Sequence, residues 1–312
     1  MTAHPRIVTL LAAATEIVCA LGLQDHLVGI SHECDYPESI RDLPRCTSPK
    51  FQLDGTSYDI DQRVRAIAQE GLSVYRMDVD LLNRLRPDVI VTQIQCEVCA
   101  VSLPEVERAV AQLVSSRPQI VPLNPVSLSD VWEDIHRVAR ALNVPHRGER
   151  LVAQLKQRMA AIHRKSRGCP NRPRVVSIEW LDPLIVGGNW MPELVERAGG
   201  KHLLAQAGQH SPIISLDQLL NCDPDVLVIV PCGFTIDQTL KEMPTLTTRE
   251  EWAQLQAVQN GRVFIADGNQ FFNRSGPRLV ESLEMLAEML HPNQFDFGHR
   301  DRNWIAYMPI RQ

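Results

Sequence analysis

The stretch RGERLVAQLKQRMAAIHRKSR, residues 147–167, predicts one long helix near the middle of the chain. Pro145 and Gly168 bracket it, as expected for a helix start and a helix end. Apolar residues recur along it at helical spacing: Leu151, Leu155, Met159 and Ile162. A helix of this size is roughly 30 Å long. It divides the chain into two parts of similar length.

Short apolar runs alternate with helical patterns on both sides of this helix. DVIVT, residues 88–92, is a continuous apolar run of the kind that lies buried in a parallel sheet. Strand–helix alternation of this kind is typical of α/β folds. We therefore predict two Rossmann-like α/β lobes with parallel sheets, joined by one long rigid helix. The predicted parts are residues 1–144, 145–168 and 169–312.

The two halves also repeat each other. RPDVIVTQIQC at 86–96 matches DPDVLVIVPC at 223–232, and RIVTL at 6–10 matches RVVSI at 174–178. In the first pair, Pro-Asp-Val precedes an apolar strand, and a cysteine follows the end of that strand. Two matches in the same order favour a shared lobe design.

Composition and charge exclude several classes of protein. The chain has 312 residues, of which 44% are hydrophobic and 22% charged, and its formal net charge is −5. Without a run of basic residues, nothing favours binding to nucleic acid. No stretch reaches the roughly 18 continuous apolar residues of a membrane helix. The first strand begins near residue 6 and leaves no room for an export signal, so a cytoplasmic location is expected.

Aromatic residues gather in the loops that follow the predicted strands. Ligands bind at the carboxyl ends of strands in open parallel sheets, so these loops are the expected site. They hold six of the sixteen aromatic residues: Tyr36, Trp180, Trp190, Phe234, Phe271 and Phe272. Such side chains suit a large, partly apolar ligand held between the lobes. Pro37 holds Tyr36 extended, which helps to present its ring.

The same loops hold His32, Cys34, Cys96, Cys99 and Cys232. Three hypotheses compete for the four cysteines. They have the ligand number for zinc or an iron–sulfur cluster. The Cys-x-x-Cys pair precedes a helix start and could be a redox dithiol. The thiols could also simply line an apolar pocket.

Three further expectations concern a catalytic use of the cysteines, the helix after Cys99 and the cysteines outside the loops. A nucleophilic site that combines His32 with Cys34 or Cys232 has no distinguishing sequence signature, but this hypothesis stays open. Ser102 and Glu105 form a predicted capping box at the start of the next helix. The other cysteines are expected to be small, partly buried hydrophobes: Cys19, Cys169 and Cys222.

Several of these segments together resemble the periplasmic binding proteins for vitamin B12 and iron-siderophores, and the vitamin B12-binding members are the closer match. The segments are RIVTLLAAATEIVCALG, LVGISHECDYP, LLNRLRPDVIVT, the long helix and RVFIADG. The resemblance covers nearly the whole chain, and Asp35-Tyr36-Pro37 is its most specific element. It implies two α/β lobes bridged by a rigid helix, and a function in binding rather than catalysis.

By position, the resemblance implies that a corrinoid would contact Asp35, Tyr36 and the loops that hold the other five aromatic residues. In such a protein Glu105 or Glu107 could dock on a transporter, but that role would lapse in the cytoplasm. The cysteine set departs from the family pattern. We therefore expect a non-catalytic cytoplasmic protein that binds cobalamin or a related corrinoid. The alternative is a zinc or iron–sulfur protein on the same scaffold, possibly redox-active, with ligands Cys34, Cys96, Cys99 and Cys232.

Overall fold

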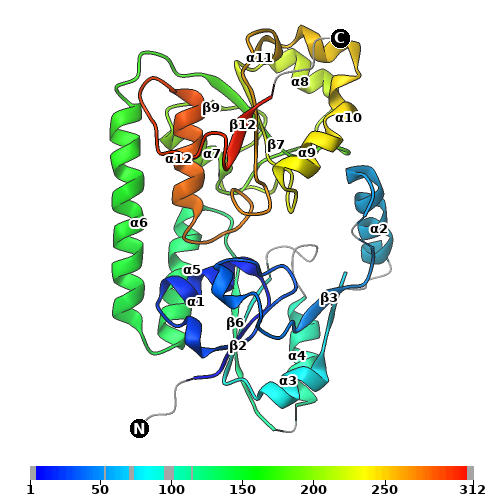
Figure 1. The fold of residues 1–312 in the computed structure, drawn as a ribbon, viewed down its shortest axis with the longest axis vertical. Helices are drawn as coiled ribbons and strands as arrows, with labels where there is room; N and C mark the ends of the chain where they lie inside the picture. The colour runs from blue at the N-terminus through cyan, green and yellow to red at the C-terminus, as the bar shows by residue number, and fades with distance from the viewer. Residues whose placement is uncertain (1–4, 53, 70–73, 95–101, 114, 308–312) are drawn as a thin grey trace. The chain divides into compact units, whose positions relative to one another are not determined.

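The computed structural model describes residues 5–307 with the exception of 53, 70–73, 95–101 and 114 (Figure 1). The chain divides into two compact units. The first unit comprises Met1–Gly55, Asp59–Pro125 and Ser129–Gln154. The second unit comprises Thr56–Tyr58, Val126–Leu128 and Leu155–Gln312. None of the helices in the described part of the chain combines the length and the apolar character that crossing a bilayer requires.

The first unit is built on a four-stranded sheet in which every neighbouring pair is parallel. Its strands, in sheet order, are β2 (Leu27–Gly29), β1 (Ile7–Thr9), β5 (Val89–Gln93) and β6 (Gln119–Leu123). All five residues of β5 are buried, as its continuous apolar sequence predicts. A separate antiparallel pair joins β3 (Thr47–Pro49) to β4 (Tyr75–Met77).

Helices lie between and after these strands. α1 (Ala12–Ala20) connects β1 to β2 and α4 (Leu103–Ala111) connects β5 to β6, because parallel neighbours require a crossover. α2 (Ser57–Gln69) lies between β3 and β4, α3 (Val79–Leu85) precedes β5, and α5 (Leu128–Ala141) follows β6. The predicted capping box of α4 is wrong. Ser102 is the N-cap residue but its side chain makes no capping hydrogen bond. Glu105 instead accepts a hydrogen bond from Lys50 Nζ at 3.2 Å.

The second unit has a six-stranded sheet with a parallel centre and antiparallel edges. β10 (Val226–Ile229) lies between β7 (Arg174–Trp180) and β11 (Val263–Ala266), and both pairings are parallel. β12 (Trp304–Ala306) adds antiparallel to β11, and β8 (Ile185–Val186) adds antiparallel to β7. The short β9 (Lys201–His202) pairs parallel with β7. The predicted α/β fold with parallel sheets is confirmed, and the antiparallel edge strands add to it.

The helices of the second unit follow the same alternation. They are α7 (Met191–Arg197), α8 (Leu216–Cys222), α9 (Ile236–Glu242), α10 (Pro244–Thr247), α11 (Gln256–Gln259) and α12 (Leu279–Leu290). α12 is almost wholly buried. Apolar side chains of β7, β10 and β11 form the centre of one core cluster with Met243, Leu246 and Trp252.

The long helix α6 comprises Pro145–Ser166. Its buried stripe consists of Val152, Leu155, Met159 and Ile162, whereas Leu151 is only half-buried. The division between the two units falls within this helix, after Gln154. The helix is therefore shared by both units, although the sequence suggested a separate segment at 145–168.

The internal repeat has a structural basis in each unit. In the first unit, Asp88 Oδ2 accepts a hydrogen bond from the backbone N–H of Arg6 at 2.8 Å. In the second unit, Asp225 Oδ2 accepts one from the backbone N–H of Arg174 at 2.7 Å. Each aspartate precedes a central strand, and each arginine adjoins or begins the neighbouring parallel strand. The Pro-Asp-Val motif thus fixes how two adjacent strands start.

Replacing Asp225 by Ala is expected to destabilise the second unit by about 1–3 kcal/mol, because the N–H of Arg174 loses its acceptor and Arg174 loses its ion pair. Urea unfolding of the purified variant measures this change. The exposed Glu250→Ala variant is the matched control and should stay within about 0.5 kcal/mol of the parent. Equal stability of both variants would contradict a structural role for the motif.

Candidate functional site

The first half of the predicted site is the loop that follows β2 in the first unit. Tyr36 exposes 42% of its surface there. The loop is held from within, because the Arg45 guanidinium donates hydrogen bonds to the backbone carbonyls of Ser31 and Cys34. Arg41 Nε donates to the carbonyl of Asp35 at 3.0 Å. A large aromatic side chain is therefore presented to solvent by an ordered loop, as a ligand contact requires.

Cys34 and His32 of this loop have different partners within the first unit. Cys34 is buried, and its Sγ lies 2.9 Å from Thr15 Oγ1. His32 Nδ1 lies 2.8 Å from Thr47 Oγ1, and its ring lies 4.9 Å from the ring of Tyr75. Burial, with the nearby Arg45, lowers the pKa of His32 to about 4, so the ring is neutral at pH 7. These contacts give both side chains a packing role and do not support a nucleophilic pair.

Four further described cysteines, Cys19, Cys46, Cys169 and Cys222, have thiols of raised pKa. Burial raises the pKa of Cys46 to about 12, and burial with the nearby Glu16 raises that of Cys19 to about 12. Burial also raises the pKa of Cys169 and of Cys222. High pKa values keep these side chains protonated and unreactive.

The predicted metal site falls partly outside the described residues, since Cys96 and Cys99 lie there. Of the other two predicted ligands, Cys34 is buried in the first unit and Cys232 is exposed in the second. Within the described part of the chain, no three His, Cys, Asp or Glu side chains come together as a metal ion would require. The zinc or iron–sulfur alternative therefore gains no support.

The second half of the predicted site lies at the carboxyl ends of β7 and β10, within the second unit. Trp180 is the last residue of β7, and Phe234 lies in the loop after β10. Their rings meet edge to face, with centroids 5.3 Å apart and planes at 60°. Trp180 is half-buried, and its buried Nε1 has no hydrogen-bond partner among the residues that the structure describes. A buried indole N–H without an acceptor costs free energy, which a ligand oxygen could recover.

Two further loops of the second unit, which are hydrogen-bonded to each other, carry polar groups. The backbone N–H of Asn189 donates to the carbonyl of Gln209 at 2.7 Å, and that of Gly188 donates to Ser211 Oγ at 3.0 Å. Asn189 Oδ1 is buried and has no hydrogen-bond partner in the described part of the chain. Within that part, the loops at and after the end of β7 thus contain one donor and one acceptor without a partner.

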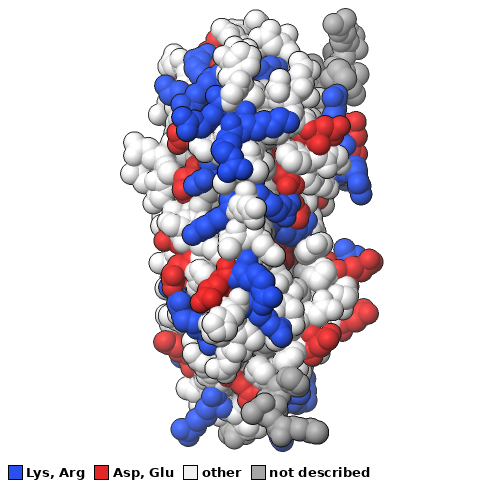
Figure 2. Space-filling model, turned by 90° about the vertical axis from the view of Figure 1, so that its left-hand side faces the viewer, with Lys and Arg blue, Asp and Glu red and all other residues white. Residues whose placement is uncertain are grey.

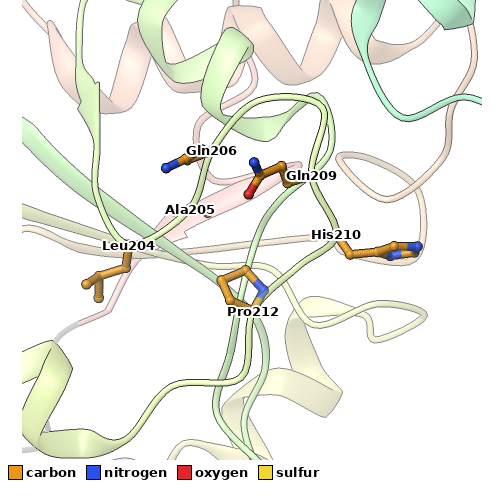
Figure 3. A pocket seen from close by; sticks show the side chains of 6 residues that line it. All are labelled: Leu204, Ala205, Gln206, Gln209, His210 and Pro212. Carbon is orange, nitrogen blue, oxygen red and sulfur yellow. The ribbon is translucent and has the colours of Figure 1, made fainter.

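A hollow of about 380 Å³ lies within the loop between β9 and α8. Figure 3 shows its lining residues on that single loop, with His210 directed away from the others. The lining consists of Leu204, Ala205, Gln206, Gln209, His210 and Pro212. Because Gln209 accepts the hydrogen bond from Asn189, the hollow adjoins the loop that follows β8.

Glu179 is a half-buried acid that the sequence did not single out. It precedes Trp180 in β7, and burial raises its pKa to about 7, although a hydrogen bond with Ser211 acts in the opposite direction. At neutral pH a large fraction of the carboxyl groups is therefore protonated, and a protonated carboxyl can donate a hydrogen bond. Its only sequence signal is a charged residue at the end of an apolar strand.

Three of the predicted aromatic contacts pack inside the second unit. Trp190 Nε1 donates to the backbone carbonyl of Phe272 at 2.7 Å, and the N–H of Phe272 donates to Ser282 Oγ at 2.9 Å. Phe271 lies beneath the guanidinium of Arg278, 4.2 Å from its ring centroid. All three aromatic side chains are buried. The structure gives them a packing role, and contact with a ligand stays a prediction.

The loop after β11 also contains two buried arginines that the sequence analysis missed. Arg278 Nη1 donates to Gln270 Oε1 at 2.8 Å, and Arg274 Nη2 donates to Asn269 Oδ1 at 3.3 Å. Buried guanidinium groups with fixed partners are strong donors for anionic or amide oxygens. The sequence signal that could have indicated them is RSGPR at 274–278, which begins and ends with an arginine.

The chain belongs to the periplasmic binding protein family, because residues 7–269 match the model of that family. It is accordingly a substrate-binding protein, and the resemblance found in the sequence is confirmed.

Two relatives and one solved structure illustrate the similarity. An uncharacterized ABC transporter substrate-binding lipoprotein, YvrC of Bacillus subtilis, is 25% identical over 93% of this chain and 81% of that protein. The vitamin B12-binding protein of Yersinia pestis is 22% identical over 92% of this chain and 87% of that protein. The periplasmic heme-binding protein RhuT from Roseiflexus sp. RS-1 in apo form has the same fold, with a TM-score of 0.67, 24% identity and coverage of 92% and 98%.

Replacing Glu179 by Gln is expected to change how stability depends on pH. A carboxyl with a raised pKa destabilises the folded state as pH rises from about 4.5 through about 7, because the unfolded chain loses its proton first. The neutral amide does not titrate. The variant should therefore gain about 1–3 kcal/mol relative to the parent between pH 5 and pH 8.

Urea unfolding at the two pH values measures this difference. The exposed Glu251→Gln variant is the control and should follow the parent at both. A parallel pH dependence of all three proteins would show that Glu179 ionises normally.

Proposed function

We propose that this protein binds a corrinoid of the cobalamin type through its strand-end loops. The vitamin B12-binding relative, which aligns over 92% of this chain, supports this choice of ligand. The observation that carries the proposal is the edge-to-face pair of Trp180 and Phe234, with the unpartnered indole N–H of Trp180 beside it. Trp180 is half-buried and Phe234 is buried, so a flat, largely apolar ligand with polar edges would contact the exposed part of Trp180, with Phe234 packed behind it.

The polar groups around this pair suit the amide side chains that surround a corrin ring. An amide presents both a carbonyl oxygen and an N–H group. The unpartnered N–H of Trp180 matches the first, and the unpartnered Oδ1 of Asn189 matches the second. The protonated form of Glu179 provides a further donor at neutral pH. Tyr36, exposed in the first unit, is the contact proposed for that unit.

Transfer of the ligand to a membrane transporter is the alternative to the expected cytoplasmic location. The Bacillus subtilis relative is named as an ABC transporter substrate-binding lipoprotein, and this supports an association with transport. The expectation that Glu105 or Glu107 has lost a docking role is a prediction, as is the cytoplasmic location. Fractionation of the native host with an antibody against this protein tests the location.

Titration of the purified protein with cyanocobalamin and dicyanocobinamide, followed by calorimetry and absorbance, tests the proposed ligand. We expect saturable binding of at least one corrinoid with a stoichiometry near one. Hemin is the competing ligand, because a similar fold occurs in a heme-binding protein. Binding of hemin without binding of either corrinoid would overturn the proposal, and so would binding of neither class.

Replacing Trp180 by Leu is expected to raise the Kd for the corrinoid about 10- to 100-fold, since both ring contact and an N–H donor are lost. Calorimetry on the variant measures this change. Phe297→Leu is the matched control, because Phe297 is an exposed aromatic residue of the second unit outside the strand-end loops. An unchanged Kd in Trp180→Leu would place the ligand elsewhere.

A further inference from the structure

A basic surface lies over the end of α6 and the residues that follow it, and the proposed function does not use it. Residues 150–178 contain eight Lys and Arg residues and no Asp or Glu. In the second unit, the exposed members of this run include Arg164, Lys165 and Arg167. Figure 2 views the side on which α6 lies, and its upper part, which belongs to the second unit, shows Lys and Arg side chains gathered together.

Part of this positive charge is neutralised within the second unit. Arg158 pairs with Glu284 at 2.7 Å, and Arg172 pairs with Glu196 at 3.1 Å. Among the described residues, no ion pair is formed by Arg164, Lys165 or Arg167. Cations in the last turn also stabilise the helix through its dipole, but that effect is confined to the last turn. Arg167 lies beyond the end of the helix.

One of these cations, Lys165, lies beside an aromatic pair that includes an exposed ring. Lys165 donates a hydrogen bond to the carbonyl of Gln294, and its Nζ lies 4.8 Å from the ring centroid of Phe295. The ring of Phe295 stacks on that of Phe297, with centroids 5.9 Å apart and planes at 21°. Phe297 exposes 42% of its surface. Lys165 is thus linked to the exposed ring of Phe297 through the buried ring of Phe295.

The exposed ring is held by an ordered segment. Glu288 is buried in α12, and its Oε1 accepts hydrogen bonds from the backbone N–H groups of Phe297 and His299. Its Oε2 accepts one from Trp304 Nε1 at 2.6 Å. A single carboxylate thus fixes the backbone that carries Phe297, so the exposure of the ring is built into the fold.

We propose that these four residues, the basic–aromatic patch, dock the second unit on an anionic phospholipid surface. The patch consists of Arg164, Lys165, Arg167 and Phe297. Lys and Arg side chains near a bilayer are attracted to anionic headgroups, and an exposed aromatic ring inserts at the boundary between headgroups and acyl chains. A soluble polyanion would use the cations but not the ring. The whole chain has a formal net charge of −5, so an anionic membrane repels the protein on average. Attraction therefore requires a part of the protein surface where positive charge is concentrated.

Co-sedimentation of the full-length protein with phosphatidylcholine vesicles, with and without phosphatidylglycerol, tests the proposal. Binding is expected only to vesicles with phosphatidylglycerol and should fall as salt is added. Each cation near such a surface strengthens binding about fivefold, so the triple variant R164Q/K165Q/R167Q should lose about a hundredfold in partition coefficient. Phe297→Ser should lower the partition coefficient without changing its salt dependence.

The matched control is the triple variant R76Q/R84Q/R108Q, which removes three exposed cations from the first unit and changes the net charge equally. It should bind vesicles like the parent. An equal loss of partition coefficient in both triple variants would show that vesicle binding depends only on net charge, and this result would overturn the proposal. So would binding to heparin but not to vesicles, or binding that Phe297→Ser leaves intact. Corrinoid affinity should not change in the patch variants, so failure here is separable from failure of the proposed ligand.

Discussion

A hydrogen bond from a backbone N–H at the start of one strand to the aspartate just before the neighbouring strand recurs in both units. It joins Arg6 to Asp88 in one sheet and Arg174 to Asp225 in the other. Parallel strands that start in register also end at one edge, and the loops that follow them gather there. This common edge brings Trp180 at the end of β7 against Phe234 after β10, although 54 positions separate them in the chain.

The elements of the fold that depend on apolar periodicity could be predicted from the sequence. β5, β10 and α6 lie where their patterns predict, because a continuous apolar run needs two buried faces and a helical stripe needs one. The repeated Pro-Asp-Val indicated a common design before any contact was known. The antiparallel strands β8 and β12 were missed, since two or three residues are too few to show a period.

The candidate site was predictable only as a set of loops. Composition does not say whether an aromatic ring faces solvent or core, and that depends on partners far away in the chain. Trp190 donates to a carbonyl 82 positions later, and Phe271 is covered by Arg278, so both are part of the packing. Cys34 and His32 are likewise engaged by Thr15 and Thr47. The pKa of Glu179 is raised by burial, and the local sequence does not show how deeply a side chain is buried.

The strand β12 has a consequence for any shortened form of this protein. It covers one side of β11 by antiparallel pairing, yet it comes from residues 304–306, after the family match ends at 269. Without it, Val263–Ala266 would present a row of unsatisfied amide and carbonyl groups along an apolar strand. Such an open edge invites pairing with another molecule and the growth of aggregates. The segment that contains β12 therefore protects the edge of β11 from self-association. Its Trp304 also donates to Glu288, the residue that holds the backbone of Phe297.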